Sequence, residues 1–275
     1  MKLIKLFFTL AFLPVFSNAQ IIKLNLPKGA QYEVTTSTKI TSIATVMGQD
    51  MESATDINTT ETVKVKDTRP VETDLVKTIS KIVANIQSMG QEMVYNSDKK
   101  DNEGAMAETF DKMKGKEKNM TIDMNGKIIK QDSTEESSSS AMMGISNEGL
   151  IFLSNKFIGR EVKTGTTWYD STSSSTGDKM STTTFGNYTI QAVNNGVATI
   201  AFAGKTNLTG TMEQMGQEMA ITSTSKVTSQ YEVDMASGLI KKSIQNSDGT
   251  MNIEAGGMSI PATTKSTITM VATQL

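Results

Sequence analysis

The stretch "YEVTTSTKITS", Tyr32 to Ser42, alternates strictly along its length. In an extended chain, one face of this stretch would carry Tyr32, Val34, Thr36, Thr38 and Ile40. A period of two with many β-branched residues is typical of an antiparallel strand that buries one face. The stretch therefore predicts a β fold with a buried face and a solvent face.

The same alternation recurs through the rest of the chain. It is found in "TETVKVKD" (60–67), "GVATIAFAG" (196–204) and the closing "STITMVATQL" (266–275). Between these stretches lie "NG" at 125–126, "NNG" at 194–196, "SG" at 237–238 and "SDG" at 247–249. Gly and Asn accept positive φ, so these are good hairpin connectors. We predict a mostly β chain of long antiparallel hairpins.

Two stretches have helical spacing instead. In residues 103–114, Met106, Phe110 and Met113 follow at intervals of four and three. Ser146 to Gly159 begins with a possible N-cap and ends at a glycine, so it predicts a second helix. The stretch 74–90 fits both periods. We interpret it as a strand, because its counterpart 205–214 contains Gly210 and three threonines and is a poor helix former.

One unusual motif occurs three times: "MGQDM" at 47–51 and "MGQEM" at 89–93 and 215–219. We interpret it as a recurrent hairpin tip with Gly at the turn and its two methionines as cross-strand neighbours. Methionine packs adaptably, so these tips are expected to form a pliable rim over an apolar ligand. The rim residues are Met47, Met51, Met89, Met93, Met215 and Met219. A Cu(I) box of soft thioethers is the functional alternative, but no His or Cys accompanies the methionines, and no metal site is expected.

The repeated motif belongs to a wider internal duplication. "LPKGAQYEV" (26–34) and "VKTGTTWYD" (162–170) open the two halves alike. After MGQEM, "NMTIDMNGKIIKQDS" (119–133) corresponds to "QYEVDMASGLIKKSIQ" (230–245). Both read as a strand ending in Asp-Met, a glycine turn and a second strand. We therefore predict two related lobes of curved, half-barrel-like antiparallel sheet with one or two packed helices.

The start of the chain has the pattern of a secretory signal peptide. Lys2 and Lys5 precede an apolar run, 6–16, that is too short to span a membrane, and Ala19 offers a cleavage site. No Cys follows, so no lipid anchor is expected, and the protein is expected to be periplasmic or secreted. No further long apolar run predicts an integral membrane segment after cleavage.

The expected organisation has four parts. Residues 1–19 are the signal peptide, 20–133 the first β lobe with its inserted helix near 103–114, 134–145 a Ser-rich linker, and 146–275 a helix with the second β lobe.

Composition removes several classes of function. The 275 residues carry a net charge of −2, with neither a basic stripe nor many aromatics, so no nucleic-acid partner is expected. Histidine and cysteine are absent, which excludes Ser-His-Asp and Cys-His units and zinc sites built on these residues. We predict a protein that is not an enzyme and that holds no cofactor. A carboxylate pair or a Ser-Lys pair in a cleft is the pattern that an enzyme would need instead.

These features resemble a family of uncharacterised secreted bacterial proteins, a domain of unknown function. The resemblance rests on the opening at 26–32, the Gly-Gln hairpins, the mid-chain helix and "GREVKTGTTW" at 159–168. It implies no known activity. More remotely, the order of elements is similar to periplasmic half-barrel lipid carriers of the lipoprotein-localisation type. That resemblance implies a curved sheet that wraps a helix and holds acyl chains, and it carries over no ligand residue.

The function expected from fold, compartment and missing catalytic residues is binding of an apolar or amphipathic, lipid-like ligand. The expected contacts are Leu150, Leu153, Phe157 and Trp168, from the most apolar stretch and the single tryptophan. Core packing is the alternative role for the same residues. A structural or interaction protein of the cell envelope with a self-filled core is the alternative function, and the sequence leaves the oligomeric state open.

Overall fold

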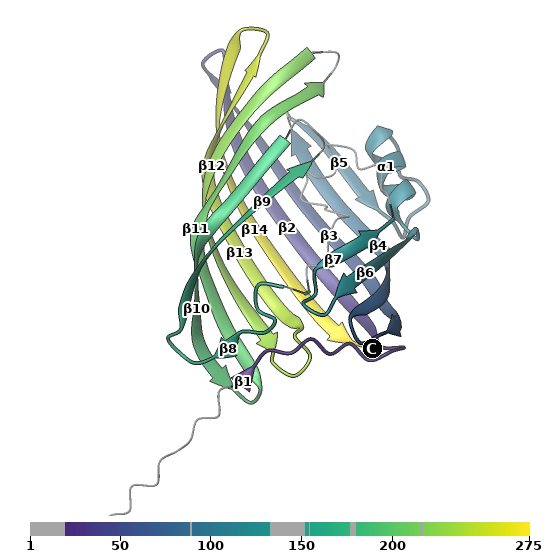
Figure 1. Ribbon diagram of the computed structural model, residues 1–275. Coiled ribbons are helices and arrows are strands. Elements are labelled where there is room, and N and C mark those ends of the chain that lie inside the picture. The colour runs from purple at the N-terminus through teal and green to yellow at the C-terminus, as the bar shows by residue number, and fades with distance from the viewer. Residues whose placement is uncertain (1–19, 89, 133–151, 154, 177–179, 215–216) are drawn as a thin grey trace, which may run out of the picture.

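The computed structural model describes residues 20–275 except 89, 133–151, 154, 177–179 and 215–216 (Figure 1). The expected signal peptide and Ser-rich linker lie outside the described residues. In chain order the elements are β1 (Gln20–Ile21), β2 (Gln31–Val46), β3 (Gln49–Thr68), β4 (Glu72–Ser88), β5 (Gln91–Asn96), α1 (Ala105–Met113), β6 (Glu117–Asp123), β7 (Ile128–Gln131), β8 (Glu161–Val162), β9 (Thr167–Thr176), β10 (Met180–Asn194), β11 (Val197–Gln214), β12 (Gln217–Asp234), β13 (Ile240–Ala255) and β14 (Met258–Gln274).

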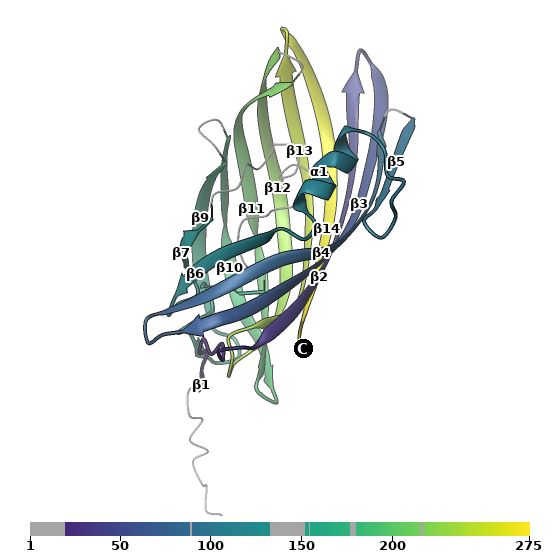
Figure 2. The same cartoon turned by 90° about the vertical axis from the view of Figure 1, so that its right-hand side faces the viewer.

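A single antiparallel sheet of 12 strands dominates the molecule, in the order β7-β6-β4-β3-β2-β14-β13-β12-β11-β10-β9, with β5 beside β4. Figures 1 and 2 show that it curves strongly around one concave side. Within the described chain the end strands β7 and β9 do not pair, so the sheet is open. The predicted class, mostly β with curved half-barrel-like antiparallel sheet, is confirmed. The two predicted halves are the two flanks of this one sheet, joined where β14 pairs with β2.

Backbone hydrogen bonds repeat between the two flanks. The Ala30 N–H donates to the Pro27 carbonyl, and the Thr166 N–H donates to the Lys163 carbonyl, at 3.0 Å in each case. Each opening turn then bonds in both directions to the second strand of the hairpin that follows it, β3 or β10. These bonds are Gly29 N to Val65 O, Val65 N to Ala30 O, Gly165 N to Ile190 O and Ile190 N to Thr166 O. The resemblance between the two sequence openings is therefore a resemblance in geometry as well.

The helix α1 is an insertion into one of the repeated strands. On the second flank, β12 runs beside β11 without a break. On the first flank, the corresponding place beside β4 is shared by β5, along residues 83–88, and β6, along 72–78. The chain that joins β5 to β6 carries α1. Its Phe110 packs against Tyr95, with ring centroids 4.9 Å apart, in a buried cluster on the concave side. The helix predicted near 103–114 is confirmed, and the strand interpretation of 74–90 is confirmed for residues 74–88.

The second predicted helix, Ser146 to Gly159, is wrong in its described part. Residues 152–153 and 155–159 form turns and one β-bridge. The Phe152 carbonyl accepts a bond from the Ile240 N–H, and the Gly159 N–H donates to the Ile22 carbonyl, at 2.8 Å each. Because these backbone groups pair with distant segments, they do not close helical turns.

The repeated Met-Gly motif does form a hairpin turn, but not with the predicted side-chain geometry. In the described copy, Val46 pairs with Gln49, and Met47 and Gly48 have φ of 51° and 80°, the backbone of a type I′ turn. Met47 therefore sits in the turn, and Met51 lies opposite Ala44 rather than opposite Met47. In the other two copies of the motif, Met93 lies opposite Ile86 and Met219 lies opposite Met212. Met89 and Met215 lie outside the described residues.

Candidate ligand-binding face

Strand register defines the two faces of the sheet. The buried Tyr32 and Val34 mark the concave face of β2. Their partners across the ladder, Val63 on β3 and Ala272 on β14, are buried as well. Directly paired residues point to the same side of a sheet, so the face of each strand follows from these pairs. The alternation that opened the sequence analysis is therefore the concave face of β2.

The lower part of the concave face is filled by the protein itself. We call this part the base: a buried cluster drawn from both flanks and from the turn segment 152–162. Phe157 is 1% exposed and Leu153, which bridges to Leu239, is 8% exposed. Both predicted ligand residues are thus enclosed by protein side chains. Trp168 is half-buried against the same cluster, and Leu150 lies outside the described residues.

An aromatic group forms the centre of the base. The Phe157 ring meets Trp168, Tyr188 and Tyr231 edge-on, with centroids 6.4, 5.5 and 5.2 Å away. Trp168 stacks on Tyr188 at 5.2 Å with an interplanar angle of 16°. Edge-on and stacked pairs are the favourable geometries of aromatic rings, so this group fixes the turn segment against β9, β10 and β12. The structure brings Phe157 and Trp168, two of the predicted ligand residues, into contact with each other.

A polar layer caps the aromatic group. Lys156 Nζ lies 2.9 Å from Asp170 Oδ2, with both side chains about one quarter exposed, and 5.6 Å from the centre of the Tyr188 ring. Burial, and secondly the charge of Asp170, raises the pKa of Tyr188 to about 12. Two polar atoms of the concave lining, Trp168 Nε1 and Thr36 Oγ1, are buried without a hydrogen-bond partner in the described structure. This layer offers donors and an acceptor to a polar group from outside the chain.

Above the polar layer, the concave lining loses its charges. We call this part the upper concave face. Its apolar side chains are Ile40, Ala44, Met51, Leu208, Met219, Ile221, Met251, Ile253, Ile260 and Ala262, and its small residues are Ser42, Ser53, Ser223, Ser225, Ser247, Gly249, Thr264 and Ser266. All are half-buried or buried. Sequence reasoning named only Ile40 and two of these methionines, although the alternation in each strand was sufficient to find the rest.

The convex face has the opposite chemistry. In the central strands β2 and β11 to β14, every Lys, Asp and Glu with a ladder partner occupies a convex position, as Lys39, Lys226, Asp248 and Lys265 do. These five strands therefore separate charge to one side and apolar or small side chains to the other.

Sequence reasoning also missed a charged group on the flank formed by β3, β4 and β6. Lys77 and Glu61 are 3% and 8% exposed, and their charged atoms lie 3.3 Å apart. Lys118, which pairs with Lys77 across the ladder, is 5% exposed. The signal was present in the sequence, because Lys77 is in phase with Leu75 and Ile79, so it falls on the buried face.

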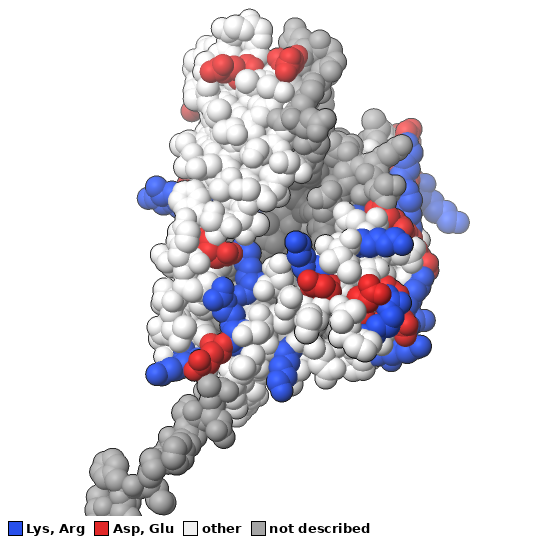
Figure 3. Space-filling view, viewed as in Figure 1, with Lys and Arg blue, Asp and Glu red and all other residues white. Residues whose placement is uncertain are grey.

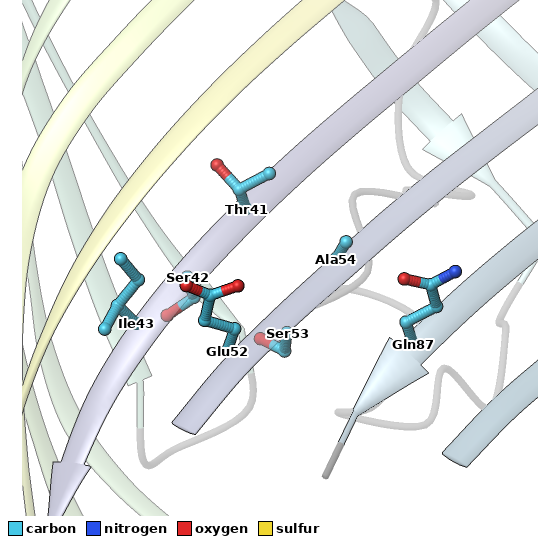
Figure 4. A pocket seen from close by; sticks show the side chains of 7 residues that line it. All are labelled: Thr41, Ser42, Ile43, Glu52, Ser53, Ala54 and Gln87. Atoms are coloured by element: carbon cyan, nitrogen blue, oxygen red, sulfur yellow. The ribbon is translucent and has the colours of Figure 1, made fainter. Parts of the chain in front are cut away.

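The grooves outside the concave face have polar linings. One of about 230 Å³ lies over β2, β3 and β4 (Figure 4), lined by Thr41, Ser42, Ile43, Glu52, Ser53, Ala54 and Gln87. Two others, of about 370 and 310 Å³, are lined mainly by charged and hydroxyl side chains of β3, β4, β6 and β7 and of β12 to β14. Apolar side chains are a minority of the residues that line each groove, whereas a site for an apolar ligand is lined predominantly by them.

The described residues contain no group of three or more His, Cys, Asp or Glu side chains close enough to hold a metal ion. Neither length nor hydropathy would let any helix in the described part of the chain cross a bilayer. The expectation that the protein is not an enzyme stays a prediction.

Residues 153–240 match the model of a family described as "Family of unknown function (DUF6263)". The predicted resemblance to a family of unknown function is confirmed over this stretch, which runs from the base through β8 to β12 and the turn before β13. No curated protein matches the chain.

The comparison with solved structures includes two examples of partial similarity. A structure titled for lipid–protein interactions in lipovitellin has 10% identity and a TM-score of 0.49, and the match covers 89% of this chain but 25% of that one. This chain thus spans about a quarter of the lipovitellin chain. An outer membrane channel from Pseudomonas putida F1 has 8% identity and a TM-score of 0.30, with 94% of this chain and 98% of the channel covered.

Proposed function

We propose that the protein binds an apolar or amphipathic, lipid-like ligand against the upper concave face, as an exported, non-enzymatic protein of the bacterial periplasm. The observation that carries the proposal is the separation of charge between the two faces of β2 and β11 to β14. An exposed sheet face normally carries polar and charged side chains, whereas this one presents Ile, Met, Ala, Ser and Gly. Covering it removes apolar surface from water, at about 25 cal/mol per Å².

The dimensions of the face fit a long hydrocarbon. On β12 the upper concave face runs from Ser225 to Met219 near the strand end. That separation of six positions (225 − 219) spans about 20 Å at the rise of a strand. The polar layer supplies Lys156, Asp170 and the unpaired Trp168 Nε1 at one end of this span. The ligand class proposed is therefore a chain-like amphipathic molecule with its polar group beside Asp170.

A matched pair of substitutions tests the proposal. Met251 faces the concave side, and its neighbour Thr250 is exposed on the convex side. We expect Met251→Asp to weaken binding of a fluorescent fatty acid at least about tenfold, because a carboxylate disrupts the apolar lining. Thr250→Asp adds the same charge on the other face and is expected to leave binding unchanged. Equal effects of the two substitutions, or no uptake of the probe by the unmodified protein, would reject the proposal.

Native mass spectrometry gives an independent readout. Protein purified gently from its own host is expected to carry a lipid-mass adduct that organic solvent releases. A bare polypeptide mass would favour the second candidate function, a structural or interaction protein of the envelope. One observation supports that alternative: the base of the concave side is already filled by the protein's own segment 152–162.

A further inference from the structure

The hairpins β2–β3, β11–β12 and β13–β14 all turn at the same end of the sheet (Figure 1). We call this the tip end and define it as the turns 47–48 and 256–257 with the exposed side chains of Ile43, Asp50, Glu52, Glu218, Glu254 and Met258. Antiparallel long hairpins necessarily bring alternate turns to one end. The strand ends around it, residues 40–55, 207–214, 217–225 and 249–264, contain no Lys or Arg, although the whole chain has 27 basic residues. The tip end therefore has a one-sided charge composition.

Among the described residues, four carboxylates of the tip end have no cationic partner. Asp50, Glu52, Glu218 and Glu254 are exposed, and none lies within 4.0 Å of a charged nitrogen in the described structure. The partners recorded for two of them are neutral: the Thr45 hydroxyl donates to Asp50 at 2.8 Å, and an Asn252 N–H donates to Glu254 at 3.4 Å.

Carboxylates nearer the middle of the sheet do have cationic partners. Asp56 pairs with Lys39 at 3.4 Å, and Asp248 pairs with Lys265 at 3.9 Å. In Figure 3 the upper end of the visible face, over the ends of β11 to β14, shows acidic atoms and no basic ones, while both kinds mix lower down. The unbalanced charge is therefore a property of the tip end and not of the surface as a whole.

Apolar side chains project at the same end. Met47 is 88% exposed, Met258 is 51% exposed and Ile43 is 41% exposed. Exposed methionine is a soft, flexible contact that adapts to varied partners. Apolar groups rimmed by like charges are a common pattern of protein–protein contact surfaces.

Pro261 separates the two hairpins that carry these methionines. The β14–β2 ladder stops at the Ala262–Ala44 pair, one residue short of Pro261. Proline has no N–H to donate, so it cannot extend a ladder. The ends of β2–β3 and β13–β14 consequently stand apart (Figure 2), and each presents its own methionine. The tip end is a forked surface rather than a closed edge.

We propose that the tip end is a docking surface for a protein partner whose contact area is basic around an apolar centre. Opposite charge steers and orients such a partner, and the methionines cover its apolar centre. The same carboxylates would repel an anionic membrane surface, so such a membrane is not the proposed partner. None of the side chains that define the tip end belongs to the upper concave face, so the inference does not depend on the proposed ligand.

The probe that tests this is a labelled amphipathic helical peptide with Lys on one face and Leu on the other, followed by fluorescence anisotropy. We expect it to bind, and to bind at least about tenfold more weakly when salt rises from about 50 to about 300 mM, because screening shortens the reach of the carboxylates. A peptide with Glu in place of Lys is expected not to bind. Absence of binding by the Lys peptide would overturn the proposal.

Two charge-matched variants locate the contact. Variant one is Asp50→Asn, Glu52→Gln, Glu218→Gln and Glu254→Gln; variant two is Glu33→Gln, Asp101→Asn, Glu103→Gln and Glu161→Gln, at exposed positions elsewhere. We expect variant one to lose at least about tenfold in affinity and variant two to keep the affinity of the unmodified protein. Equal losses would show that only net charge matters and would reject the docking surface.

Two further variants separate this surface from its alternatives. Met47→Ser with Met258→Ser is expected to weaken peptide binding about three- to tenfold, and no change would refute the apolar part of the proposal. Met251→Asp, on the concave face, is expected to leave peptide binding intact; loss there would place the peptide in the ligand site instead. Binding to vesicles of phosphatidylcholine with a cationic lipid, without binding to the peptide, would replace the protein partner by a membrane.

Discussion

At the residue scale, single side chains decide how the turn segment is held. Phe157 has no regular secondary structure around it, yet it is 1% exposed and touches three aromatic rings from β9, β10 and β12. Its position comes from packing rather than from a local conformational preference. The sequence indicated that Phe157 and Trp168 belong together through their apolar character, but it did not indicate that they close the base.

Removing the Phe157 ring is therefore expected to destabilise the fold strongly. We expect Phe157→Ala to lower the free energy of unfolding by about 3 to 5 kcal/mol, because it leaves a cavity inside a packed aromatic group. Urea unfolding followed by Trp168 fluorescence measures the change. Tyr169→Ala, which truncates an aromatic ring that is 63% exposed, is the control and is expected to change it by less than about 0.5 kcal/mol. Similar losses at both positions would contradict this account of the base.

Tyr188 predicts a dependence of stability on alkaline pH. Its pKa in the folded protein is raised to about 12, whereas an unfolded chain titrates near 10. Below about pH 10 both states keep the proton, so Tyr188 adds no pH dependence there. Between about pH 10 and 12 the unfolded state releases the proton first, so the free energy of unfolding falls as pH rises. Burial raises the pKa of Tyr32 and Tyr231 in the same direction.

Chemical denaturation at several pH values measures this slope. We expect Tyr188→Phe to make the decline between pH 10 and 12 shallower, because one of the groups with a raised pKa is gone. An unchanged slope would show that the hydroxyl of Tyr188 is not the titrating group.

At the element scale, turn chemistry sets the register of each long hairpin. The β2–β3 turn places Met47 at φ 51° and Gly48 at φ 80°, while the β10–β11 turn places Asn195 at φ 48° and Gly196 at φ 79°. The two backbones are nearly the same, but Asn tolerates the left-handed region better than Met does. The Met-Gly turn is thus slightly less favourable in free energy than an Asn-Gly turn, and it exposes a methionine at the tip end.

Replacing Met47 by a residue that favours this turn is expected to stabilise the fold. We expect Met47→Asn to raise the free energy of unfolding by about 0.5 to 1 kcal/mol, since Asn-Gly is the favoured type I′ pair. The shift in the thermal midpoint measures it. Met51→Asn places the same residue on the half-buried concave face and is expected to be destabilising. Destabilisation by Met47→Asn would contradict the assigned turn.

The elements themselves were partly predictable. Alternation identified the strands because a sheet with one solvated face imposes a period of two on its sequence, and α1 was found from its apolar spacing. The segment after Ser146 carries an equally good helical pattern. In its described part it forms turns instead, because Ile22 and Ile240 take its backbone hydrogen bonds, and no local pattern records those distant partners.

At the scale of the whole molecule, the two flanks depend on one another. The β14–β2 ladder runs from Ala262–Ala44 to Gln274–Tyr32, and the base draws its residues from both flanks. Neither flank can bury its concave side without the other. The internal repeat therefore folds as one unit, although the sequence presents it as two.

We accordingly expect a single unfolding transition. Trp168 reports on the second flank, and because the chain has no cysteine, a dye on Val94→Cys, an exposed position of β5, reports on the first. The two thermal midpoints are expected to agree to within about 1 °C, as in a two-state domain. Midpoints separated by several degrees would show that the flanks are independent lobes.

The sequence by itself determined the β class, the polar convex face, the turns at 125–126, 194–196 and 237–238 and the inserted helix, because each depends on the preferences of neighbouring residues. The predicted connector at 247–249 was wrong: these residues lie inside β13, paired with β14. The sequence also marked the repeat, which recurs in the hydrogen bonds of the two opening turns. Only the tertiary structure decided that β14 pairs with β2, that 152–162 fills the base, and that Lys77 and Glu61 meet while buried. These features join residues far apart in the chain. Their stability comes from burial and pairing that exist only once the whole sheet has formed, and no stretch of sequence records that energy by itself.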